Sequence, residues 1–141
     1  MTPLQALQET LAGEHAAVYV YGVLGGRLSA TEHPELMARV VDAYDTHVRR
    51  RDHVTALVEA GGAEPVAAEV SYQLPNPVLT ADQVTAAALV TEQRCASVYA
   101  QAVGSTSRTD RRWAVEALVD TAVRQLGFGG RPDDFPGVRE L

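Results

Sequence analysis

The sequence predicts an all-α fold in which four helices form a bundle of two antiparallel hairpins joined by a long crossover. Three observations support this fold class. Apolar residues recur at helical spacing in four segments, the connections after the first and third segments are short, and the connection in the middle is long. Short connections make consecutive helices antiparallel neighbours, whereas a long connection lets the chain return along the bundle before the next helix begins.

The first two helices are expected at residues 3–28 and 34–60. Thr2 and Gln5 have the spacing of a capping box, which marks the start of the first helix. Glycines at residues 61–62 mark the end of the second helix, because glycine readily adopts the backbone conformation that terminates helices.

The third and fourth helices are expected at residues 80–103 and 108–126. Thr80 begins the third helix with a second capping box, and Ser107 with Asp110 gives the fourth helix a weaker one. The short connection between these two helices predicts that they form the second hairpin.

The crossover, residues 61–79, is expected to run along the bundle as an extended strap. At about 3.3 Å per residue, its roughly 18 residues can span about 60 Å, whereas a helix of about 26 residues is only about 39 Å long. The strap can therefore carry the chain to the opposite end of the bundle. The tail, residues 127–141, is rich in turn-forming residues, and Phe128, Phe135 and Val138 are expected to attach it to the helices.

A single domain over residues 1–141 is expected, because this length suits one core and no segment has the composition of a linker. The net charge of −6 argues against binding to nucleic acid, since phosphate groups require a basic surface. The longest apolar run, Ala16–Gly26, is too short to cross a bilayer, and the N-terminus lacks the form of a signal peptide. Cys95, the only cysteine, excludes an internal disulfide. We therefore expect a cytoplasmic protein that binds neither nucleic acid nor membrane.

Each expected helix places an ionisable side chain near its middle, on or beside its apolar face. These residues are Glu14, His47 with Arg51 one turn later, Glu92 and Glu116. On the fourth helix the apolar face is expected to consist of Val115, Val119, Ala122 and Leu126, with Glu116 at its border. Ionisable residues at similar depth on four helices indicate a site, because sites in helical bundles are built from side chains on facing helices.

Five segments spread over nearly the whole chain carry a resemblance to a known family. They are LQETLAGEHAAVYVYG, HVRRRDHVTALVEAGG, SYQLPNPV, LVTEQRCASVYAQAV and DDFPGV. On these segments the chain resembles an uncharacterised ferritin-like family of high-GC bacteria. The resemblance implies a ferritin-like four-helix bundle, and it implies no activity, because the function of that family is unassigned.

Metal-binding ferritin-like proteins carry a Glu on the first and third helices and a Glu-x-x-His motif on the second and fourth. Through the resemblance, four of these six ligands correspond to Glu14, His47, Glu92 and Glu116. Tyr44 stands in place of the Glu on the second helix, and Val119 stands in place of the His on the fourth. Each motif has therefore lost one ligand, which argues against a dinuclear metal centre.

Three interpretations of these residues remain open. The first is a metal-free buried network in which the guanidinium of Arg51 neutralises the carboxylates and Tyr44 donates a hydrogen bond. The second is a single Fe, Mn or Zn ion held by the four remaining ligands. The third is that these residues form no site at all.

Two functions follow from the first two interpretations. A metal-free network favours a non-catalytic bundle without a cofactor, which acts by binding a small molecule or a protein and is expected to form a homodimer. A single bound metal favours a mononuclear metal-dependent oxidoreductase. The sequence contains no phosphate-binding glycine loop, no nucleophile elbow and no HExxH motif, so it points to no other class of enzyme.

Overall fold

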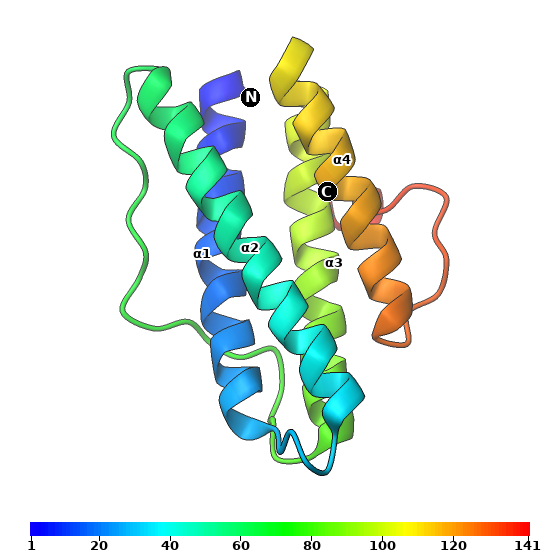
Figure 1. The fold of residues 1–141 in the computed structure, drawn as a ribbon. Helices are drawn as coiled ribbons and strands as arrows, with labels where there is room; N and C mark the ends of the chain where they lie inside the picture. Colours follow the sequence, from blue (N-terminus) through cyan, green and yellow to red (C-terminus); the bar gives the residue numbers. More distant parts are fainter.

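The computed structural model describes the backbone of residues 1–141 and every side chain except that of Glu140. It contains four α-helices and a short 3₁₀ helix near the C-terminus (Figure 1). Their bounds are α1 Pro3–Arg27, α2 Pro34–Ala60, α3 Ala81–Ser105, α4 Arg108–Gly127 and η1 Val138–Glu140. Each α-helix begins and ends within two residues of the position expected from the sequence.

The helices pair as two antiparallel hairpins, α1 with α2 and α3 with α4, and the two hairpins pack together. The predicted all-α four-helix bundle is therefore confirmed. α1 and α3 lie side by side, α2 packs against α1, and α4 packs against α3. Figure 1 shows α2 and α4 on the same side of the α1–α3 pair. None of the described helices is both long and apolar enough to cross a membrane.

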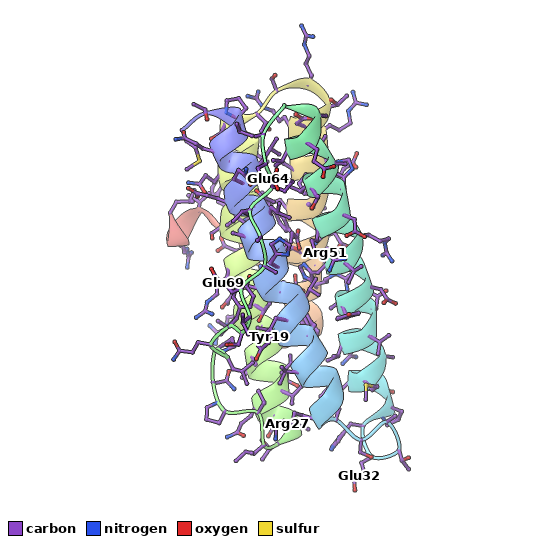
Figure 2. All side chains as sticks on the ribbon, turned by 90° about the vertical axis from the view of Figure 1, so that its left-hand side faces the viewer. Tyr19, Arg27, Glu32, Arg51, Glu64 and Glu69 are labelled. Atoms are coloured by element: carbon purple, nitrogen blue, oxygen red, sulfur yellow. The ribbon has the colours of Figure 1, made fainter. Side chains whose placement is uncertain are left out.

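The strap, residues 61–79, returns the chain along α1 to the opposite end of the bundle, as predicted. Near its start, the side-chain amide of Gln8 donates to the carbonyl oxygen of Glu64 at 2.7 Å. Further along, the ring of Tyr72 lies 5.6 Å from the ring of Tyr19. Figure 2 shows the strap passing in front of α1, from Glu64 near one end to the level of Tyr19.

Both strong capping boxes predicted from the sequence are present, at Thr2 and at Thr80. Each threonine hydroxyl accepts from the backbone N–H three residues later, where a glutamine side chain accepts in return. The weaker box predicted at Ser107 is wrong, because the Ser107 side chain makes no capping hydrogen bond to any described residue. α4 begins instead with Arg108 in a left-handed backbone conformation, with φ of 53°.

Apolar side chains fill both ends of the bundle. One cluster centres on Val20, Leu24, Val40 and Val84, and another consists of Leu7, Leu11, Val54 and Val58. Between them, halfway along the helices, the buried residues include charged side chains. The two apolar ends therefore enclose a polar layer and shield it from water.

α4 turns a different face to the bundle from the one expected. Its buried residues are Ala114, Ala117, Thr121 and Gln125. Val119 and Leu126 of the predicted apolar face are 59% and 46% exposed. The prediction was wrong because small and polar side chains of α4 pack against the neighbouring helices, while the larger apolar side chains point outward.

The tail is attached by other residues than those predicted, apart from Phe128, which is buried at the end of α4. Phe135 and Val138 are 71% and 53% exposed, so the expectation that they attach the tail was wrong. Gly137 makes the contact instead, with φ of 79° and its Cα against the carbonyl of Ala96. A side chain at Gly137 would overlap that carbonyl, so the tail needs glycine there to lie on α3.

Candidate functional site

Three charged side chains meet in the polar layer: Glu14 of α1, His47 of α2 and Glu92 of α3. Each is at most 1% exposed. The Nδ1 of His47 lies 2.7 Å from Oε2 of Glu14, and its Nε2 lies 3.1 Å from Oε1 of Glu92. The imidazole therefore bridges two carboxylates that belong to different hairpins.

Two buried tyrosines complete the hydrogen bonds of these carboxylates. The hydroxyl of Tyr21 donates to Oε1 of Glu92 at 2.6 Å, and the hydroxyl of Tyr99 donates to Oε1 of Glu14. Burial, reinforced by the adjacent carboxylates, raises the pKa of both hydroxyls well above 10.0. The tyrosines therefore remain protonated donors.

His47 is an imidazolium in this arrangement. A carboxylate oxygen only accepts hydrogen bonds, so each ring nitrogen that faces one carries a proton. Burial by itself lowers the pKa of His47, but the hydrogen bonds and charges of Glu14 and Glu92 raise it from 6.5 to about 9. Burial raises the pKa of Glu92, but the bond from His47 outweighs burial and lowers it below 4.5.

Arg50 supplies a second positive charge beside the centre. Its NH1 donates to the hydroxyl oxygens of Tyr99 at 3.3 Å and Thr121 at 3.0 Å. Its NH2 donates to Oδ2 of Asp120 at 2.6 Å. Burial opposes the charge of this guanidinium, but the Tyr99 oxygen and Glu14 outweigh burial and raise its pKa. His47 is thus the cation in direct contact with both buried carboxylates, whereas Arg50 pairs with Asp120 and reaches Glu14 through the hydroxyl of Tyr99.

The predicted role of Arg51 was wrong. Its guanidinium is about a third exposed, at 32%, and pairs with the neighbouring Asp52 at 2.8 Å. Arg50, three residues after His47, enters the bundle in its place. The predicted apolar face of α2 included Tyr44 and other half-exposed apolar residues, and Arg51 lies on the same side of the helix as Tyr44. The prediction therefore placed Arg51 on the buried face and left Arg50 in solvent.

The two hairpins contribute related halves of the site. Glu14 and Tyr21 on α1 have the same spacing as Glu92 and Tyr99 on α3. Each tyrosine donates to the glutamate of the other helix. Because α1 and α3 are antiparallel, this reciprocal exchange gives the centre an approximate two-fold symmetry.

The outer helices, α2 and α4, are related by the same approximate two-fold symmetry as α1 and α3. Arg50 of α2 donates to Asp120 of α4, and Arg124 of α4 donates to the hydroxyl of Thr46 on α2 at 2.9 Å. Each arginine lies four residues after the acceptor on its own helix. Thr46 therefore corresponds to Asp120, and the same two-fold relation extends over all four helices.

This relation locates the fourth-helix position of the site and corrects two predictions. His47 follows Thr46, so its counterpart is Thr121, and the counterpart of Tyr44 is Leu118. Glu116, which was predicted to be a ligand or network member, is exposed and belongs to neither position. Tyr44 is 37% exposed and lies outside the network, so its predicted part in it was also wrong.

As arranged, the donor set does not fit a metal ion. Both ring nitrogens of His47 face carboxylates, and the pKa raised to about 9 favours the imidazolium, which has no lone pair for a metal. In addition, α4 offers Thr121 where a histidine would be needed for the second half of a dinuclear site. Among the described residues, no three His, Cys, Asp or Glu side chains are placed to hold a metal. One acceptor is free, since Oε2 of Glu92 is buried and has no hydrogen-bond partner among the described residues.

Two further polar candidates have other roles. The ring of His15 lies 3.0 Å from the carbonyl oxygen of Val66, so it contacts the strap rather than the centre. Cys95 is buried beside the centre, and burial raises the pKa of its thiol well above 9.0. A thiol held in this state is a core side chain and a poor nucleophile.

Sequence reasoning identified Glu14, His47 and Glu92 and missed the residues that hydrogen-bond to the network. Tyr21 and Tyr99 lie two helical turns after Glu14 and Glu92, so helical spacing could have placed each on the face of its glutamate.

The chain belongs to the family described as "Domain of unknown function (DUF4439)", whose model matches residues 6–140. No curated protein matches the sequence. Among solved structures, the chain is similar to the conserved hypothetical protein Rv2844 of Mycobacterium tuberculosis. The two share 30% identity with a TM-score of 0.82, and the match covers 90% of this chain and 87% of that one.

Proposed function

We propose that this protein is a ferritin-like bundle that works without a resident metal ion and acts through binding rather than catalysis. In this proposal, His47 and Arg50 supply the positive charge that metal ions supply in metal-binding ferritin-like proteins. The family to which the chain belongs has no assigned function, so the proposal depends on the chemistry of the site.

The observation that carries the proposal is the engagement of both ring nitrogens of His47. A histidine that ligates a metal must offer an unprotonated nitrogen. Here a metal would have to displace two charge-assisted hydrogen bonds, at 2.7 and 3.1 Å, between side chains that are fully buried. Such bonds are roughly twice as strong as neutral ones, so the imidazolium competes with a metal for the same carboxylates.

The burial of the centre supports a role other than catalysis. Glu14, His47 and Glu92 are at most 1% exposed, and the apolar ends of the bundle enclose them. Catalysis requires a reacting group within about 3.5 Å of the substrate. A substrate would therefore have to open the helices to meet these side chains.

Elemental analysis and NMR of the histidine ring test the proposal together. Protein purified without chelators should contain far less than one Fe, Mn or Zn per chain. The ring of His47, assigned by comparison with His47→Gln, should carry protons on both nitrogens at neutral pH. A stoichiometric metal, or a neutral His47 ring at pH 7, would overturn the proposal.

One observation favours a second candidate, a mononuclear metal-dependent oxidoreductase. The free, buried Oε2 of Glu92 is an acceptor to which a cation could bind. Glu14 and His47 would become further ligands only if His47 lost its protons and the side chains rearranged, because they do not form a ligand set as they are arranged. A ligand that binds only the folded state raises its melting temperature. If Fe(II), Mn(II) or Zn(II) raises the melting temperature of the wild-type protein but not of Glu92→Gln, this second candidate is supported.

A further inference from the structure

α4 carries a row of apolar side chains on its outer face, most of them exposed. The row, called here the α4 seam, consists of the exposed Val115, Val119 and Leu126 and the half-buried Ala122. Val115, Val119 and Leu126 are 42%, 59% and 46% exposed, and the adjacent Val123 is 61% exposed. A continuous apolar row of this kind is unusual on a surface that faces only water.

The spacing of the seam indicates what covers it. Its members follow one another at intervals of four, three and four residues, which is the a/d spacing of a helix that packs against another helix at a shallow angle. α4 already packs against α3 through a different face, which contains Ala114, Ala117 and Thr121. In Figure 1 no other helix lies over its outer side.

The tail forms one wall beside the seam. Pro132, Asp133 and Pro136 of the tail and Val119 and Leu126 of α4 line an apolar groove of about 280 Å³. Phe135, in the same part of the tail, is 71% exposed. The seam is therefore part of a wider apolar surface that the described residues leave uncovered.

We propose that a second copy of this chain covers the α4 seam, with the two α4 helices antiparallel across a two-fold axis. The inference deepens the proposed function, on which it rests, by naming the partner of a protein that acts through binding. In this arrangement Val119 lies against Ala122 of the second copy, and Val115 lies against Leu126 of the second copy. Because the face is self-complementary, the pair closes on itself as a dimer.

Charge complementarity argues for the second copy and for the antiparallel direction. The exposed Arg108 and Arg112 extend the seam at the N-terminal end of α4. Asp133 borders it near the C-terminal end, where it also lies 3.7 Å from Arg139, and this end carries the negative end of the helix dipole. Antiparallel pairing places the arginines of each copy beside the acidic end of the other.

Parallel pairing is disfavoured by the same charges. It would place Arg108 and Arg112 against the same residues of the second copy, and it would bring the negative ends of the two helix dipoles together. Like charges placed opposite each other across an interface oppose association.

The size of the seam predicts a weak dimer. A helix of this length is about 30 Å long and about 10 Å wide, which gives a footprint of about 300 Å². A standard stable interface buries about 800 Å² on each partner. The α4 helix by itself is therefore too small for a stable dimer interface. We expect the tail, with Phe135, to add area to the interface, and we expect the dimer to dissociate on dilution.

Sedimentation velocity over a range of protein concentrations tests the proposal. The wild-type chain should shift from monomer to dimer as its concentration rises, and Val119→Glu should weaken the dimer by about tenfold or more. Val41→Glu is the matched control, because Val41 is a similarly exposed valine, at 47%, that lies on α2 beside a groove against α1 and away from the α4 seam. It should dimerise like the wild type.

A wild-type chain that stays monomeric at its solubility limit would overturn the proposal, and the seam would then belong to another partner. A dimer that survives Val119→Glu but is lost in Val41→Glu would also overturn it. The failure of the proposed function is recognised separately, by the metal content and the protonation of His47.

Cysteine crosslinking tests the direction of pairing. Under mild oxidation, a mixture of Val115→Cys and Leu126→Cys chains should form a crosslinked heterodimer, whereas Val115→Cys alone should remain uncrosslinked. Efficient crosslinking of Val115→Cys alone would require parallel helices and would overturn the antiparallel arrangement. The native Cys95 is buried and should not compete.

Discussion

Replacing His47 by glutamine removes the buried cation that bridges Glu14 and Glu92. Glutamine keeps polar atoms in the layer but carries no charge, so the two carboxylates remain buried with one compensating charge fewer. Breaking a buried charge pair by removing one partner costs about 3–5 kcal/mol. We expect His47→Gln to be destabilised by this amount in acid to neutral solution and by less at higher pH.

The pH dependence follows from the sign of the pKa shift. The pKa of His47 rises from 6.5 in the unfolded chain to about 9 in the folded protein. Each pKa unit corresponds to about 1.4 kcal/mol, so protonation of His47 contributes about 3 kcal/mol to folding. Because the folded pKa is raised, this contribution is complete below pH 6.5 and is lost as the pH rises through about 9.

Glu92 sets the acid limit of the same window. Its pKa is lowered in the folded protein, so its contribution is present above 4.5 and is lost as the pH falls. The wild-type protein should therefore be most stable between pH 4.5 and pH 6.5. Burial raises the pKa of the Cys95 thiol well above 9.0, so ionisation of that thiol affects the stability mainly above pH 9.0.

Urea unfolding followed by circular dichroism, repeated at pH values from 4.5 to 9, measures the free energy of unfolding. The wild type should lose stability from pH 6.5 to 9, and His47→Gln should lose much less. His33→Gln is the control, because His33 is exposed and its side chain makes no capping hydrogen bond. If His47→Gln kept the wild-type slope between these pH values, the imidazolium assignment would be refuted.

Four further substitutions have expected results in the same unfolding assay. Arg50→Met should cost about 1–3 kcal/mol because Tyr99, Thr121 and Asp120 lose their donor, whereas Arg51→Met should change stability by less than about 1 kcal/mol; equal effects would contradict the assignment of Arg50 to the network. Gly26→Ala should stabilise by about 0.5–1 kcal/mol, because no atom outside its own helix lies near the added methyl group, and a loss of stability would argue against an open site there. Gly137→Ala should destabilise by at least about 1–3 kcal/mol, because its φ of 79° is left-handed and a side chain would overlap Ala96; an unchanged midpoint would mean that the tail is not held there.

The part of the site that the sequence predicted consists of residues whose chemistry is unusual at the centre of an apolar face. Glu14, His47 and Glu92 stand out in this way, because a charged residue in the middle of such a face must find a partner. The hydrogen-bond donors around them could not be recognised by the same criterion. A buried tyrosine such as Tyr21 or Tyr99 also fits an ordinary apolar core.

The sequence by itself determined the lengths of the helices, their pairing into two hairpins and the course of the strap, because caps, glycines and connection lengths are local features of the chain. The tertiary structure decided which arginine enters the core and which face of α4 is buried. Helical periodicity shows which residues share a face, but close packing between helices decides which face turns inward. Ala114 and Ala117 lie against the bundle, which leaves Val119 and Leu126 outside.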